Sequence, residues 1–182
     1  MTKQDQDQAD FLANEGKSLY QAKKYLPAAE NFARAAEIYD AAGDTLLGAE
    51  MRNNLCVSLL LGKKPQQALD AVQGTSELFK ADGQMTTAGM ALANEASVRK
   101  DLGETEPAID LFTQAADIFQ AAGEDQLYLE TMQSVSGLKM KSRNLTGALF
   151  SMQKGLAGVQ KPTLRQRLLK NLLNIPDKLL NK

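Results

Sequence analysis

Small and apolar side chains recur along this chain at a fixed interval of 40 residues. Within each interval the apolar positions lie three or four residues apart, the spacing of one face of an α-helix. A fixed period of 20 to 50 residues is typical of stacked helical repeats, in which each unit buries its apolar face against its neighbours. The clearest markers of the period are Ala28, Ala68, Ala108 and Ala148, followed by Gly43, Gly83 and Gly123.

Each period predicts two helices joined by a short turn, and the pattern divides the chain into four repeats. A glycine after the second helix fits the left-handed residue that ends many helices, and a proline near a helix start fits the first turn. The repeats are expected at residues 5–43, 44–83, 84–123 and 124–160. The expected helices cover residues 8–22, 25–42, 45–61, 66–81, 84–102, 107–122, 125–142 and 145–157.

A segment of different character follows the fourth repeat, at residues 161–182. Its leucines fall on one face of a helix from Leu164 to Ile175, which Pro176 interrupts. A repeat array exposes an apolar face at each end, and a terminal helix commonly covers it. We therefore expect this amphipathic segment to be a capping helix.

Charge is unevenly distributed along the chain. The segment from Lys161 to Lys182 holds six basic residues and one acidic residue, a net charge of +5, whereas the preceding part has 15 basic and 21 acidic residues. A basic amphipathic helix can also lie on an anionic membrane surface. The cap is the preferred interpretation of this segment, and membrane binding is the alternative. The acidic body, which lacks aromatic residues beside basic ones, argues against nucleic acid as a partner.

Aligned on the 40-residue interval, the repeats resemble tetratricopeptide repeats (TPRs). That pattern has small residues at positions 8, 20 and 27, a bulky residue at 24 and often asparagine at 6. Here position 6 is Asn14, Asn54, Asn94 and Ser134; position 8 is Gly16, Cys56, Ala96 and Ser136; position 27 is Ala35, Thr75, Ala115 and Gly155. HEAT repeats have a similar period, but this small-residue pattern fits TPRs better.

Two features depart from the usual tetratricopeptide pattern. The usual repeat has about 34 residues, so the extra length here predicts longer helices, similar to those of soluble NSF attachment proteins. The phrases FARAAEIYDAAGD and FTQAADIFQAAGE carry that second resemblance. At position 11, Leu19 and Leu59 give way to Arg99 and Lys139, so Val98 and Leu138 are expected to pack instead.

The resemblance implies an all-α, right-handed superhelix of four hairpins plus the terminal helix. It also implies a concave groove, lined by the first helix of each hairpin, that binds a peptide or a helix. We therefore expect a protein-interaction scaffold that uses no cofactor and no metal. The candidate partner-binding residues are Asn14, Lys17, Tyr20, Asn53, Asn54, Val57, Met90, Asn94, Ser97 and Lys100.

Two interpretations remain for the asparagines at position 6. An amide ladder could hold the backbone of an extended peptide, because each amide offers donors and an acceptor. Alternatively, each asparagine bonds backbone or side chains within its own hairpin. The carboxylate clamp of some family members is not expected, since only Asn54 of the five aligned positions matches it. Cys56 is expected to pack as a small apolar residue at a close helix approach.

Apart from the repeats, the sequence contains no recognisable catalytic motif. The sequence has no histidine, which removes the commonest general base and metal ligand. It also lacks a phosphate-binding glycine loop, so we predict that the protein is not an enzyme. A polar, acidic start and a single cysteine favour a cytoplasmic protein. A membrane-docking adaptor and a small TPR chaperone are the alternative functions, and the oligomeric state is left open.

Overall fold

The structure, a computed structural model, describes residues 2–159 and 162–173, and every regular element in these ranges is an α-helix. The expected all-α class of helical hairpins is therefore confirmed. By compactness the chain divides into two units, Met1–Glu104 and Thr105–Lys182. The division falls inside the third expected repeat, 84–123, so each unit is described by itself.

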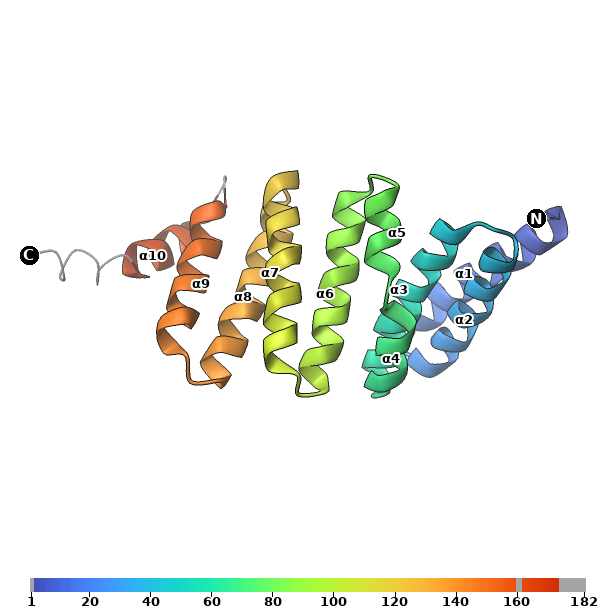
Figure 1. Cartoon of the computed structure of the whole chain (residues 1–182), viewed down its shortest axis with the longest axis horizontal. Helices are drawn as coiled ribbons and strands as arrows, with labels where there is room; N and C mark the ends of the chain where they lie inside the picture. Colours follow the sequence, from blue (N-terminus) through green and yellow to red (C-terminus); the bar gives the residue numbers. More distant parts are fainter. Residues whose placement is uncertain (1, 160–161, 174–182) are drawn as a thin grey trace, which may run out of the picture. The chain divides into compact units, whose positions relative to one another are not determined.

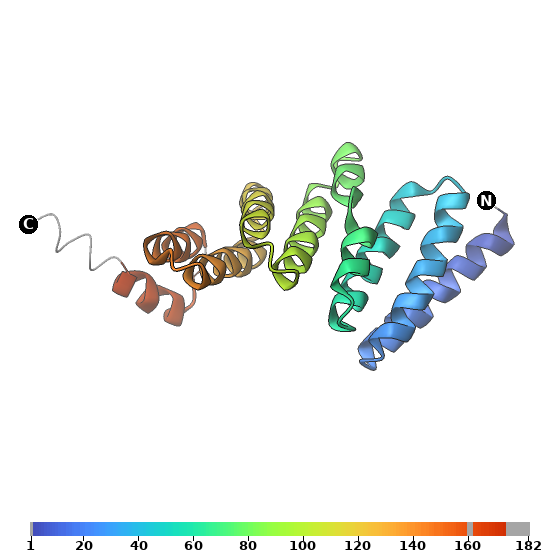
Figure 2. The same cartoon turned by 60° about the horizontal axis from the view of Figure 1, so that its bottom comes forward.

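The first unit contains six helices in the described residues (Figure 1). They are α1 (Lys3–Gln21), α2 (Tyr25–Ala41), α3 (Thr45–Leu61), α4 (Pro65–Val72), α5 (Thr75–Ala81) and α6 (Met85–Asp101). Figure 2 shows α1, α2 and α3 lying side by side, with α2 packed against both of its neighbours. The core between them is formed by small residues and a few large ones, including Phe32, Tyr39 and Met51.

The second unit contains α7 (Thr105–Ala122), α8 (Asp125–Lys141), α9 (Leu145–Gly158) and α10 (Leu164–Leu173). Helix α8 packs against both α7 and α9, and α10 lies against α9 (Figure 2). The largest buried side chains here are Tyr128 and Phe119. Tyr128 fits against Gly158, where an added Cβ would lie 2.3 Å from the tyrosine ring.

Local sequence explains where the helices begin and end. Thr2 and Asp5 form a capping box at the start of α1, so this helix begins five residues earlier than the sequence pattern predicted. Asp44 caps α3 through the N–H of Leu47. After α2, Gly43 has a φ of 81° and the N–H of Asp44 donates to the Tyr39 carbonyl oxygen, which is the expected glycine ending.

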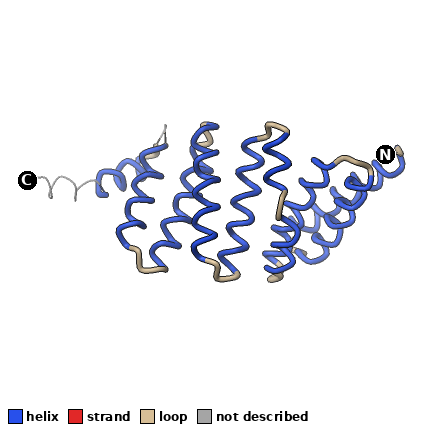
Figure 3. Tube along the Cα trace, in the orientation of Figure 1, coloured by secondary structure: helices blue, strands red, loops and turns tan. Residues whose placement is uncertain are grey.

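The expected helix over residues 66–81 is interrupted, which corrects the sequence-based prediction. Helix α4 ends at Val72, and α5 begins at Thr75 after Gly74, whose φ is 79°. Figure 3 shows the loop between the two helices. Thr75 is fully buried, and its hydroxyl donates to the Val72 carbonyl oxygen over 2.8 Å. The buried hydroxyl thus takes an acceptor that a continuous helix would have used for its own backbone.

The C-terminal segment is described only as far as Leu173. Helix α10 begins at Leu164 as the leucine pattern predicted, while Lys161 and residues 174–182 of the expected tail lie outside the described residues. Although α10 packs against α9, Leu164, Leu168 and Leu169 remain exposed. The described part of the expected cap therefore carries an apolar surface of its own.

Candidate protein-binding site

All ten candidate binding residues lie on α1, α3 and α6, the first helices of the first three repeats. In the first unit these helices are neighbours, because α3 contacts α6 and Lys17 of α1 reaches Glu50 of α3. Most of the ten side chains are exposed or half-buried and so are accessible to a partner. The alignment of the repeats had assigned all ten residues to the first helix of a repeat, and the structure has them on these helices.

Four of the ten candidates line one hollow of the first unit. Lys17 and Tyr20 come from α1, and Asn54 and Val57 from α3; Gln21 and the ring of Phe32 complete the lining. We call this the first-helix hollow. Gly16 lets the Phe32 ring pack closely against α1, since a Cβ at that position would lie 2.8 Å from the ring. The hollow thus has an apolar floor and a polar rim.

The asparagines on these helices fall into two groups. The Asn94 side-chain amide donates to the Asn53 oxygen over 3.2 Å, and the Asn53 amide donates to the Ala49 carbonyl oxygen over 3.2 Å. This pair links α6 of the third expected repeat to α3 of the second, so Asn94 bonds between hairpins and not within its own hairpin. In contrast, the described residues provide no hydrogen-bond partner for the side chain of Asn54 or Asn14. Of the three asparagines at position 6, only Asn94 has a side-chain partner among the described residues.

The charged and aromatic side chains on the rim of the first-helix hollow make only weak contacts within the protein. Lys17 Nζ lies 3.9 Å from a Glu50 oxygen, and both side chains are about half exposed. Such an exposed pair contributes little to folding stability. Tyr20 packs edge-on against Tyr25, with ring centroids 5.7 Å apart. A partner could therefore replace the contact with Glu50 and stack on Tyr20 at small energetic cost.

The α6 candidates do not line this hollow. Met90 and Lys100 are exposed, and the Ser97 hydroxyl donates to the Ala93 carbonyl oxygen. Next to them, Arg99 binds Glu95 and Glu104 at 2.7 Å each, and the hydrogen bond that Arg99 donates to the Glu95 carboxylate raises the pKa of Arg99. As the sequence predicted, Val98 is fully buried in place of the charged residue. Leu138 is likewise buried next to Lys139.

Cys56 is a packing residue, as expected. It is fully buried in a cluster with Leu59, Ala68 and Val98, and burial raises its pKa to about 12. The thiol is therefore protonated at neutral pH and poorly nucleophilic. Within residues 2–159 and 162–173, no three metal-ligating side chains gather, and no helix is long and apolar enough to span a membrane.

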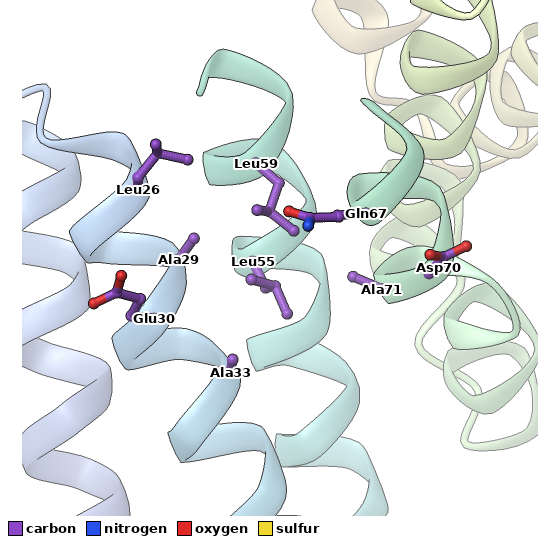
Figure 4. A pocket seen from close by; sticks show the side chains of 9 residues that line it. All are labelled: Leu26, Ala29, Glu30, Ala33, Leu55, Leu59, Gln67, Asp70 and Ala71. Carbon is purple, nitrogen blue, oxygen red and sulfur yellow. The ribbon is translucent and has the colours of Figure 1, made fainter. Parts of the chain in front are cut away.

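A second hollow, which the repeat pattern did not predict, lies between α2, α3 and α4. Figure 4 shows Leu26 and Ala29 from α2 and Leu55 and Leu59 from α3 around an apolar floor, with Glu30 and Asp70 at opposite sides. Ala33, Gln67 and Ala71 complete it. The sequence feature that indicates this hollow is a partly exposed alanine on each of α2 and α4, Ala33 and Ala71. Their small side chains leave space between the helices.

The fold defines a protein built from helical-hairpin repeats. The chain belongs to the soluble NSF attachment protein (SNAP) family, whose model matches residues 2–171. The longer repeats had indicated this resemblance. None of the curated proteins matches the sequence closely enough to identify it further.

Solved structures share the fold at low sequence identity. Aspartyl phosphate phosphatase F from Bacillus subtilis aligns with a TM-score of 0.76 and 19% identity, over 98% of this chain and 48% of that one. BtubC (BKLC) from P. vanneervenii aligns with a TM-score of 0.59 and 14% identity, over 96% of this chain and 84% of that one. This chain thus spans about half the length of the phosphatase structure, and these likenesses establish the fold alone.

Proposed function

We propose that this protein is a non-enzymatic scaffold that binds a peptide or helix of another protein along α1, α3 and α6. The first-helix hollow carries this proposal, because it combines an apolar floor with an unengaged amide and an accessible tyrosine. The family description, an attachment protein, supports binding to another protein. A scaffold of this kind would have its effect through the activity of the partner protein that it binds.

The chemistry of the hollow favours a short segment with one apolar anchor. Val57 and the Phe32 ring would contact the anchor, and Tyr20 would cover its side. The Asn54 amide can both donate to and accept from the backbone of the segment. Lys17 would bind a carboxylate of the segment in place of Glu50. Aromatic residues in such hollows commonly contribute most of the binding energy.

A peptide display library tests this proposal. Peptides selected on the wild-type protein should lose at least about ten-fold in affinity for the variant Tyr20→Ala with Asn54→Ala. The matched control is Glu30→Ala with Asp70→Ala in the hollow of Figure 4, which should retain full affinity. Selected peptides that bind both variants equally, or lose affinity only for the control variant, would place recognition elsewhere.

A membrane-docking adaptor is the second candidate, supported by the exposed leucines of α10 beside Arg165 and Arg167. Sedimentation with vesicles containing an anionic lipid tests it, using the wild type and a chain that ends at Gln160. Sedimentation of the wild type alone would support membrane docking. Failure of both to sediment would leave the protein-binding scaffold as the function.

A further inference from the structure

The two ends of the repeat pattern expose side chains that are buried at every internal repeat. At the start, Phe11 of α1 occupies the register position of Met51, Ala91 and Thr131. Those three residues are at most 6% exposed, whereas Phe11 is 66% exposed. Met51 is buried in the cluster that includes Phe32 and Tyr39 of the preceding helix α2. Phe11 therefore occupies a position that is buried in the other three repeats, yet its side chain is exposed.

The same comparison holds at the other end, on α9. Leu149 occupies the register position of Ala29, Leu69 and Ile109, which are at most 7% exposed, but it is itself 58% exposed. Phe150, 64% exposed, follows it at a position where the other repeats have the acidic residues Glu30, Asp70 and Asp110. An exposed phenylalanine in place of a solvated carboxylate indicates a surface that is covered by something.

Helix α10 packs against α9, yet Leu149 and Phe150 of α9 stay exposed, and α10 exposes leucines of its own. We call the exposed residues Leu149, Phe150, Leu164, Leu168 and Leu169 the rear patch. Arg165 and Arg167 are exposed on α10, Lys170 is partly exposed, and α10 has no acidic residue. The rear patch is thus apolar with a positive border.

Helix α1 has the complementary character. Around Phe11 it presents the exposed acidic residues Asp7, Asp10 and Glu15. Self-pairing of two rear patches would bring the basic residues of two α10 helices together, and self-pairing of two α1 helices would bring acidic residues together. Like charges placed together at an interface disfavour such pairings. Helix α1 thus matches the rear patch in both charge and apolar content.

We propose that α1 of one copy of this chain docks on the rear patch of a second copy, head to tail. The contact joins the exposed Phe11 side of α1 to the rear patch. It is heterologous, since different surfaces meet, so each copy keeps one free α1 and one free rear patch. Copies can therefore add in series. This inference is independent of the peptide-binding proposal, which concerns a different face.

Sedimentation velocity with single-end variants tests the arrangement. The wild type should form species larger than a dimer as its concentration rises and should dissociate as salt is raised, because charge attraction is screened. Phe11→Ser removes the front contact, and Phe150→Asp restores the acid found at this position in the other repeats. Each variant alone should be monomeric. Mixed in equal amounts, they should form a dimer and nothing larger, since one intact α1 and one intact rear patch remain.

Circular dichroism serves as the folding check, and both substituted residues are largely exposed, so helical content should not change. Glu30→Ala with Asp70→Ala is a control that should associate as the wild type does. Three results would overturn the proposal: a wild type that is monomeric at every concentration, association that Phe11→Ser leaves unchanged, or a mixture that stays monomeric. Loss of peptide binding with intact association would refute only the scaffold proposal.

Discussion

The second helices of repeats two and three occupy equivalent positions but fold differently. Residues 105–122 form the continuous helix α7, whereas residues 65–81 are divided into α4 and α5 at Gln73 and Gly74. Both segments bury a phenylalanine at the same register position, Phe79 and Phe119. Hydrophobic spacing is therefore shared, and it does not decide whether the helix is continuous.

The difference lies in two register positions. Repeat three has Gln114 and Ala115, and repeat two has Gly74 and Thr75. Ala115 and Thr75 are both fully buried, so the threonine hydroxyl needs a partner inside the protein. Thr113 of α7 meets this need within a continuous helix, by donating to the Ile109 carbonyl oxygen over 2.8 Å. We attribute the break in repeat two to the buried threonine together with a glycine that adopts the left-handed conformation.

The largest expected effect is the loss of a buried ring. Phe119→Ala should lower the free energy of unfolding by about 3–5 kcal/mol, because it leaves a cavity in a rigid helix pair. Phe79→Ala should cost less than Phe119→Ala, since the seven-residue α5 can shift to fill part of the space. Urea unfolding of both variants measures the difference. A larger loss for Phe79→Ala would show that α5 is as firmly held as α7.

A second prediction concerns the left-handed glycine. Gly74→Ala should destabilise the protein by about 1–2 kcal/mol, because a side chain at a φ of 79° is strained. The register-matched control is Gln114→Ala, on the exposed face of α7, which should change stability by less than about 0.5 kcal/mol. Equal effects of the two substitutions, measured by urea unfolding, would contradict the assigned role of Gly74.

A third prediction asks whether repeat two can be made to resemble repeat three. Gly74→Gln alone should destabilise the protein, and adding Thr75→Ala should recover part of that loss, since the segment can then form one helix. The expected coupling between the two substitutions is on the order of 1 kcal/mol. Helical content by circular dichroism should rise in the double variant. Strictly additive effects and unchanged helicity would argue that other residues hold the break open.

The smallest effects are expected in the turns within repeats two and three. Lys63 has a φ of 62° and Gly103 a φ of 85° at equivalent positions. Lys63→Gly should therefore stabilise the protein, and Gly103→Lys should destabilise it, each by up to about 1 kcal/mol. Thermal or urea unfolding can resolve opposite signs of this size. Changes of the same sign would mean that the lysine side chain makes a contribution of its own.

The sequence determined the class of fold and most helix boundaries. The 40-residue spacing predicted the helices ending at Gly43, Gly83 and Gly123, because local propensity and turn residues act over a few positions. It also predicted the compensating burial of Val98 and Leu138. The division of residues 65–81 escaped prediction because Gly74 and Thr75 are each tolerated in a helix taken alone.

For the candidate site, the repeat alignment predicted on which helices the residues lie, but it did not predict which contacts their side chains make. It placed the ten residues on α1, α3 and α6. It did not show that the Asn94 side chain would be hydrogen-bonded to Asn53, whereas the Asn54 side chain has no partner among the described residues. The hollow of Figure 4 depends on alanines of two helices far apart in the sequence. Local sequence thus determined which residues face outward from each helix. Only the packing of helices against one another decided which of those side chains are hydrogen-bonded and which surround a hollow. It also decided which apolar side chains remain exposed in the first and last hairpins.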